Sequence, residues 1–209
     1  MEVLVINGSP KPNGCTDRAL REVESELHKA GITTHRVEVA GKEIRGCIAC
    51  NYCREHGKCV FSDIVNETAP LLAKADGLLV GTPVYYADAG ASVRALMERL
   101  FYSTSGVIDK TMKVGAAVAS SRRAGSTTAL NELMEYFTIS AMPVASSTYW
   151  NEVHGFVATD VEKDLEGLQT MRNLGRNMAF LIRAIDALKQ KEGLPRMERG
   201  AFTSFPDGK

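Results

Sequence analysis

Short apolar runs alternate with amphipathic stretches along most of this chain, and that alternation restricts its fold more than any other feature. Residues 2–8, 75–83 and 112–120 are nearly continuous apolar runs closed by turn residues, a pattern typical of strands buried on both faces. Residues 33–39 alternate like a strand nearer a sheet edge. Residues 140–150 are a weaker fifth strand, in which Pro143 indicates an edge or a bend.

The intervening segments carry apolar residues three or four positions apart, so we expect helices there. The first of these helices begins near Thr16, and the others cover residues 63–74, 89–102, 126–139 and 160–190. Regular alternation of strands and helices predicts an α/β fold with a parallel, doubly wound sheet and right-handed crossovers. With no repeat or low-complexity linker, we expect one domain over residues 1–192, followed by a tail at 193–209 that is rich in Gly, Pro and charge.

Charge and hydrophobicity exclude several classes of partner. Lys plus Arg and Asp plus Glu number 25 each, so no net field draws the chain to nucleic acid or to an anionic membrane. The start, "MEVLVINGSP", lacks the basic region of a signal peptide, and no apolar stretch approaches the roughly 20 residues of a membrane helix. We therefore expect a cytoplasmic protein. In that reducing compartment, clustered cysteines favour metal or redox chemistry over a structural disulfide.

Ligands of doubly wound sheets bind beyond the carboxyl ends of the strands, where the loops 8–16, 82–89 and 119–126 are expected here. The first loop, "GSPKPNGCT", follows a buried strand and opens a helix, the context of a phosphate-binding loop. It has neither a Walker lysine nor the spacing of G-x-G-x-x-G. It favours a terminal phosphate held by hydrogen bonds without a Mg²⁺ clamp, the alternative being a plain Gly/Pro turn.

The second and third loops suggest what else binds there. Tyr85 and Tyr86 leave the end of a central strand, and two aromatic rings at that point suit a flat heterocycle, unless each simply packs on the sheet rim. The third loop, "SSRRAGST", is polar. Its Arg122 and Arg123 are placed either to meet a phosphate or to lie in solvent.

"VLVINGSPKPNGCT", "ADGLLVGTPVYY" and the polar third loop resemble the flavodoxin-like NAD(P)H-dependent FMN reductase superfamily over about residues 1 to 190. The resemblance implies a five-stranded sheet of order 2-1-3-4-5, NAD(P)H as co-substrate, and a homodimer or homotetramer. It places the FMN phosphate on Ser9, Lys11, Asn13, Cys15 and Thr16. It places the isoalloxazine ring on Pro83, Val84, Tyr85, Tyr86, Ser121 and Gly125.

Four of the five cysteines lie in "GCIACNYCREHGKC", at Cys47, Cys50, Cys53 and Cys59. The spacing C-x2-C-x2-C-x5-C is compact, which favours a cubane cluster, whereas structural zinc more often uses two separated C-x2-C pairs. Zinc, with His56 as a possible replacement ligand, and free or redox-paired thiols remain open. Cys15 lies in the phosphate loop, and we expect it to be a neutral packing or hydrogen-bonding thiol.

The cysteine run resembles the cluster motif of the iron–sulfur flavoproteins, a branch of the same superfamily in which the motif also follows the second strand. The resemblance implies a [4Fe–4S] cluster on the four cysteines, in a loop inserted at 42–62. It also implies an FMN-dependent oxidoreductase that moves electrons between NAD(P)H or a protein donor, FMN and the cluster, and that serves a small-molecule or protein redox partner.

The alternatives are a simple NAD(P)H:FMN or quinone reductase without a cluster, and a non-enzymatic redox carrier. The sequence assigns no catalytic acid or base. Trp150, Asn151 and His154 fall close to the flavin loops in topology, where a structural role at the rim or a subunit contact is the simpler interpretation.

Overall fold

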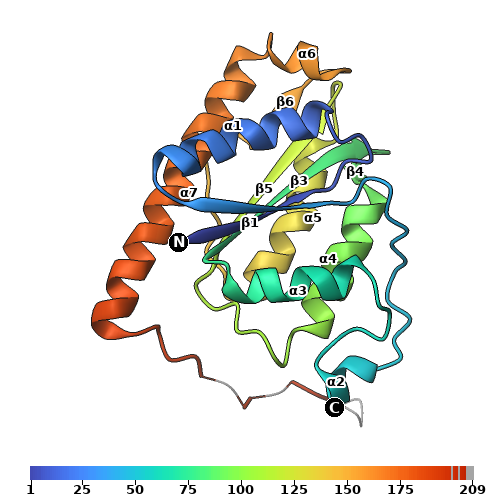
Figure 1. Ribbon diagram of the computed structural model, residues 1–209, viewed down its shortest axis with the longest axis vertical. Coiled ribbons are helices and arrows are strands. Elements are labelled where there is room, and N and C mark those ends of the chain that lie inside the picture. Colours follow the sequence, from blue (N-terminus) through green and yellow to red (C-terminus); the bar gives the residue numbers. More distant parts are fainter. Residues whose placement is uncertain (199, 202, 206–209) are drawn as a thin grey trace.

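The computed structural model describes residues 1–198, 200–201 and 203–205, and it contains a parallel sheet with helices on both faces (Figure 1). The parallel strands lie in the order β2-β1-β3-β5-β6. This is the predicted 2-1-3-4-5 order, because β4 is an additional short strand that pairs antiparallel with the end of β3. The strands are β1 (Glu2–Asn7), β2 (Thr33–Glu38), β3 (Gly77–Tyr85), β4 (Asp88–Ala89), β5 (Val114–Ser121) and β6 (Glu152–His154).

The predicted fifth strand at 140–150 is wrong in position. Only an isolated bridge between Gly115 and Val144 forms there, and the sheet gains its edge strand later, at β6. Pro143 accepts a hydrogen bond from the Gly115 amide at 2.9 Å, but it has no N–H of its own to continue a ladder. The chain then leaves the sheet and returns at Glu152, which pairs with Ala119.

Helices cover both faces of the sheet. α1 (Cys15–Lys29), α6 (Ala158–Val161) and α7 (Leu165–Glu192) lie on one face. α3 (Ile64–Lys74), α4 (Ala91–Ser103) and α5 (Ser126–Thr138) cover the other face, and the short α2 (Tyr52–His56) lies within the long segment between β2 and α3 (Figure 1).

The C-terminal helix differs from its prediction at its start. The stretch 160–190 is divided between α6 and α7, because the side chain of Asp164 caps α7 by accepting from the Gly167 amide at 2.9 Å. In the described part of the chain no helix has both the length and the hydrophobicity needed to cross a bilayer, although α7 runs for 28 residues. Of the predicted tail, residues 199, 202 and 206–209 lie outside the described residues.

Alternation along β1 separates the two halves of the core. Val3 and Val5 point to the face that α1 and α7 cover, whereas Leu4 and Ile6 point to the face that α3 and α4 cover. All four side chains are fully buried, and burial of an aliphatic side chain of this size stabilises the fold by about 1.5–3 kcal/mol. A strand buried on both faces explains why its sequence reads as a continuous apolar run.

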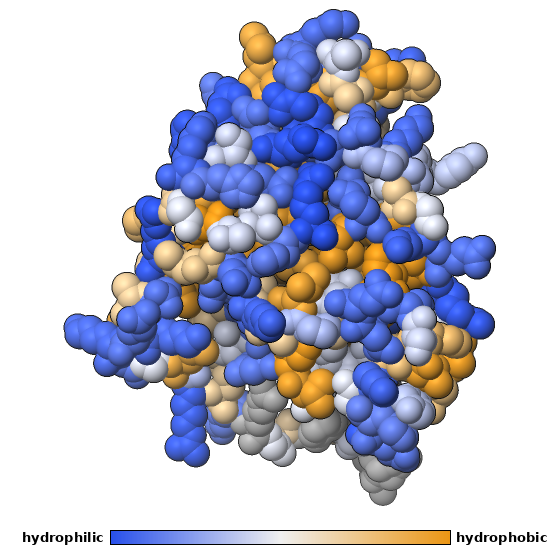
Figure 2. Space-filling view, in the orientation of Figure 1, coloured by the Kyte–Doolittle hydropathy of each residue, from blue (hydrophilic) through white to orange (hydrophobic). Residues whose placement is uncertain are grey.

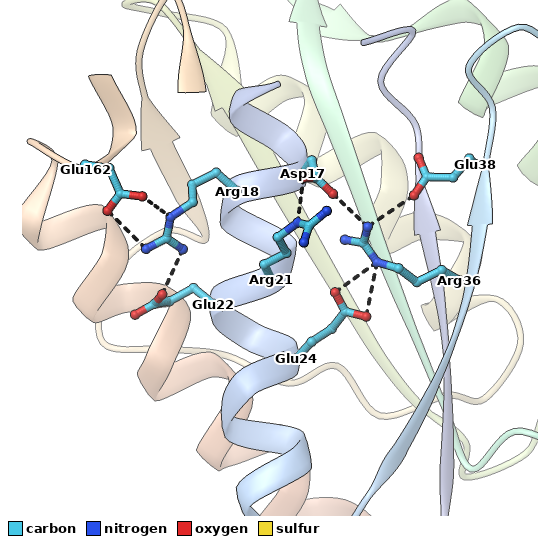
Figure 3. Close-up of polar contacts among 8 residues, drawn as sticks. All are labelled: Asp17, Arg18, Arg21, Glu22, Glu24, Arg36, Glu38 and Glu162. Carbon is cyan, nitrogen blue, oxygen red and sulfur yellow. Dashed lines mark hydrogen bonds and ion pairs between the residues drawn. The ribbon is translucent and has the colours of Figure 1, made fainter. Parts of the chain in front are cut away.

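Ion pairs hold the outer face of α1 against its neighbours (Figure 3). Arg36 of β2 contacts Asp17 at 2.7 Å, Glu24 at 3.0 Å and Glu38 at 3.2 Å. Partial burial opposes the charge of Arg36, but the carboxylates around it raise its pKa above the ordinary value. Since Asp17 lies in the first turn of α1, this network fixes the end of the helix that follows the loop 8–16.

Candidate functional site

The loops 8–16, 82–89 and 119–126 meet at the carboxyl edge of the sheet, as predicted. The strand register brings their starting points together, since Asn7 lies beside Gly81 and Pro83 lies beside Ser120. The Gly8 amide donates to the Gly81 carbonyl at 2.8 Å, which holds the first loop against the second.

The first loop is shaped by its own backbone and short side chains. The Lys11 amide donates to Ser9 Oγ at 3.1 Å, and the Gly14 amide donates to the Lys11 carbonyl at 3.2 Å. Gly14, which has no side chain, is the N-cap of α1, so the first-turn N–H groups of the helix are not covered by a capping side chain of that residue. Ser9 is buried, whereas Lys11 and Asn13 are exposed. This geometry can receive an anion at the start of α1.

Thr16 and Cys15 open α1 in different environments. Thr16 Oγ1 lies 2.7 Å from Ser120 Oγ in a buried hydrogen bond that ties the first loop to the third. Cys15 is partly buried, and burial together with the charge of Asp160 raises the pKa of its thiol. This direction favours the neutral thiol that the sequence analysis expects.

The second loop is a tight hairpin between β3 and β4. Tyr86 and Ala87 form its two-residue turn with φ angles of 51° and 65°, both left-handed, a geometry usually given to Asn-Gly. The side chain of Tyr86 is fully exposed. Left-handed backbone at residues other than glycine is strained and tends to occur at binding sites.

Gly125 lets the third loop approach this hairpin. Its φ is 93°, and a Cβ built on it would lie 2.7 Å from Val84 Cγ1 and 2.8 Å from the Ala87 Cα. Any other residue would be both strained and too close. The close approach of the two loops therefore depends on Gly125.

His154 also belongs to this edge. Its Nδ1 lies 3.2 Å from Ser121 Oγ, which accepts a hydrogen bond from Ser126 Oγ at 2.9 Å. The structure therefore brings His154 to the third loop, whereas Arg122 and Arg123 are exposed. Trp150 is exposed as well and lies edge-on against Tyr149.

A charged group that the sequence analysis did not single out supports the hairpin. Arg94 of α4 lies 3.5 Å from Asp88 of β4 and 2.5 Å from Glu132 of α5. Burial and the nearby Asp88 raise the pKa of Glu132 to about 7, while the bonds that Asp88 makes lower its own pKa. The carboxyl groups of Asp88 and Glu132 thus both pair with Arg94.

The four clustered cysteines line one cavity, together with Arg99 and Tyr102 of α4. Ala49 and Asn51 adopt left-handed φ angles of 52° and 58°, which turn the chain sharply between the cysteines. All the cysteines are free thiols. Among the described residues, no three His, Cys, Asp or Glu side chains converge closely enough to hold a single metal ion.

The surroundings of the cavity are partly apolar. Ile48 and Val60 are exposed near the cysteines, and Figure 2 shows a hydrophobic patch at the lower right, over the segment between β2 and α3. His56, considered as a replacement ligand, instead stacks on Tyr52 with ring centroids 3.8 Å apart.

Hydrogen bonds from neighbouring residues hold Cys47 and Cys59 in position. The Ala49 amide donates to Cys47 Sγ at 3.4 Å, and the Cys47 amide donates to Glu98 at 3.0 Å. Asn66 brackets Cys59, accepting from its amide at 3.0 Å and donating to its carbonyl at 2.9 Å.

Arg99 is the charged residue at this cavity that the sequence analysis missed. It is 1% exposed, and its guanidinium donates to Cys59 Sγ at 3.1 and 3.4 Å. A signal was available, because Arg99 follows Leu96 by three positions and so shares the buried stripe of its helix. A charged residue on an apolar stripe indicates a specific partner.

Solved structures with the same fold define the general class. An NAD(P)H:quinone oxidoreductase from Methanothermobacter marburgensis superposes with a TM-score of 0.66 at 18% identity, over 85% of this chain and 96% of that one. A flavodoxin, WrbA-like protein from Agrobacterium tumefaciens gives 0.60 at 16% identity, over 88% and 98%. The fold is therefore flavodoxin-like.

Sequence relatives narrow the class to a family. The model of the NADPH-dependent FMN reductase family matches residues 1–156. Two iron–sulfur flavoproteins of Methanocaldococcus jannaschii are 35% and 30% identical, over 88% and 93% of this chain and 99% and 100% of their own lengths. The chain belongs to the NADPH-dependent FMN reductase family and, within it, to the iron–sulfur flavoproteins.

Proposed function

We propose that this protein is an FMN-dependent oxidoreductase that passes electrons between NAD(P)H or a protein donor, FMN and a [4Fe–4S] cluster. The observation that carries the proposal is the single cavity lined by Cys47, Cys50, Cys53 and Cys59 in a chain whose three strand-end loops also converge. Family membership supports both halves of the proposal.

FMN would be held at the carboxyl edge of the sheet. The first loop would bind its phosphate through Ser9, Lys11, Asn13, Cys15 and Thr16, aided by the N-terminus of α1. The isoalloxazine would lie against Pro83, Val84, Tyr85, Tyr86, Ser121 and Gly125. Bound FMN supplies the exchange between two-electron hydride chemistry and one-electron transfer.

The donor chemistry of the cavity fits an iron–sulfur cluster. It offers four thiols, a backbone N–H directed at Cys47, and the buried positive charge of Arg99 beside Cys59. Cationic and N–H groups around thiolate ligands stabilise the net negative charge of such a cluster. The four cysteines would therefore be its ligands.

α4 connects the two proposed cofactor sites. Its first residue, Ala91, follows the hairpin, and Arg99 lies eight positions later at the cysteine cavity. At 1.5 Å per residue this separation is about 12 Å along the helix axis. One rigid element thus spans the two sites.

Cofactor analysis of protein purified without oxygen tests the proposal. We expect FMN, iron and sulfide in the purified protein, with NADH or NADPH bleaching the flavin. Zinc without sulfide, or no metal at all, would leave a plain FMN or quinone reductase. FAD in place of FMN would contradict the phosphate loop assignment, and failure of both nicotinamides to reduce the flavin would favour a carrier fed by a protein.

We further propose that the protein is a homodimer or homotetramer. Leu165, Phe180 and Leu188 expose apolar side chains along α7, although the helix buries its opposite side against α1. A second copy that covers these side chains would remove them from water. Light scattering at micromolar concentration should give a mass above the 22.7 kDa of one chain, and a monomer would refute the proposal.

A further inference from the structure

Arg99 has more contacts than a structural ion pair requires. Its Nη1 and Nη2 donate to the two carboxylate oxygens of Asp63 at 2.7 and 3.0 Å, a bidentate pair. Its remaining N–H groups reach two other acceptors, namely Cys59 Sγ, through Nε and Nη2, and the Arg45 carbonyl at 3.3 Å. Two bonds to sulfur, two to Asp63 and one to the carbonyl account for all five donors of a guanidinium.

The orientation of Arg99 is fixed from several sides. Its guanidinium carbon lies 4.9 Å from the centre of the Phe61 ring, in a cation–π contact. Asp63, its carboxylate partner, also caps α3 by accepting from the Val65 amide at 3.1 Å. A guanidinium stays protonated in proteins, so Arg99 places a fixed positive charge beside Cys59.

Resting on the proposed function, we propose that Arg99 is a positioning residue that raises the reduction potential of the cluster through its N–H bonds to Cys59 Sγ. Reduction adds a negative charge to the cluster and its thiolates. Hydrogen bonds and a fixed positive charge at a ligand sulfur stabilise that added charge, and these are levers by which proteins tune such potentials.

Arg45 provides a matched control. Its guanidinium lies over the same Phe61 ring at the same 4.9 Å, but its side chain is exposed to solvent. Arg99→Lys keeps the positive charge and removes the two hydrogen bonds that Nε and Nη2 donate to Cys59 Sγ. Arg45→Lys changes the same residue type beside the same ring and leaves Arg99 and Cys59 in place.

The test is a redox titration of the cluster in full-length protein reconstituted without oxygen, followed by absorption and by EPR of the reduced cluster. We expect Arg99→Lys to make reduction about tenfold less favourable, a fall of about 59 mV for a one-electron couple. Arg45→Lys should leave the potential unchanged, and the flavin potential should stay the same in both variants.

A second variant decides the matter if Arg99→Lys holds no cluster. Asp63→Asn keeps an oxygen that can cap α3 but removes the charge that neutralises Arg99, so the potential should rise. A wild-type potential in Arg99→Lys, or in Asp63→Asn where Arg99→Lys holds no cluster, would overturn the role of Arg99. An equal fall in Arg45→Lys would overturn it as well. Wild-type protein that carries no iron and sulfide would instead overturn the proposed function, and this inference with it.

Discussion

The carboxyl edge of the sheet, where FMN is proposed to bind and which is here called the flavin edge, and the cysteine cavity are positioned by different means. At the flavin edge, loops leave neighbouring strands whose register is set by backbone hydrogen bonds, and small residues such as Gly8 and Gly125 let the loops approach. At the cavity, the cysteines lie in a long irregular segment. Side chains from elsewhere hold it, above all Arg99 from α4 and Asn66 from α3.

This difference predicts which substitutions would disrupt each site. A site built on strand ends tolerates side-chain changes, provided that the backbone can still close. A site built on a loop depends on the few long side chains that reach it. The two sites should therefore fail independently, and each prediction below tests that separation.

The largest effect is expected at the cavity. Cys50→Ser removes a proposed ligand from the middle of the run, so most of the iron should be lost while FMN stays bound. Iron, sulfide and flavin analysis of the purified variant measures both. Cys15→Ser is the control, and it should retain both cofactors. Iron kept in Cys50→Ser but lost in Cys15→Ser would show that the cluster lies elsewhere.

The reciprocal change is at the flavin edge. Gly125→Val places a branched side chain at a φ of 93° and against Val84 and Ala87, which strains the backbone by about 1–2 kcal/mol before any clash. FMN affinity should fall about tenfold or more, while iron content stays at the wild-type level. Titration of apoprotein with FMN measures the affinity.

Gly106→Ala is the matched control for that variant. A Cβ at Gly106 meets nothing within 4 Å, so flavin affinity should not change. Loss of iron together with FMN in Gly125→Val would show that the two sites are not independent.

A smaller effect is expected at Glu132, where a substitution should alter the stability of the fold without altering FMN binding. Glu132 has a pKa raised from 4.5 to about 7, so its carboxyl favours the neutral form in the folded protein. A carboxyl group whose pKa is raised by folding stabilises the folded protein at low pH. That stability is lost as the pH rises from about 4.5 through about 7.

Glu132→Gln removes this dependence. Because Glu132 is partly exposed and coupled to Asp88 and Arg94, we expect the variant to gain only about 1 kcal/mol over wild type at pH 8 and little at pH 5. Urea unfolding at the two pH values measures the gain. FMN affinity should be unchanged if backbone register positions the site, and a large loss of affinity would give the Asp88–Arg94–Glu132 group a direct part in binding.

Local sequence patterns correctly predicted the central strands of the sheet and the loops that follow them. Continuous apolar runs identified β1, β3 and β5, whereas the order of the parallel strands was predicted from the family resemblance and matches the observed order. The edge strand was misplaced, because Pro143 and a three-residue strand carry little periodic signal. The two-residue turn at Tyr86 and Ala87 was missed, since neither residue is typical of left-handed backbone.

By itself, the sequence determined the alternation of strands and helices, the loops at the carboxyl edge and the spacing of the four cysteines, because each depends on residues close together in the chain. Only the tertiary structure decided which side chains surround those cysteines. Arg99 is 40 positions from Cys59, and its bonds to that sulfur exist because α4 packs beside the loop. His154 likewise meets Ser121 only through the pairing of β6 with β5. Contacts of this kind depend on the register and packing of whole elements, which no local pattern encodes.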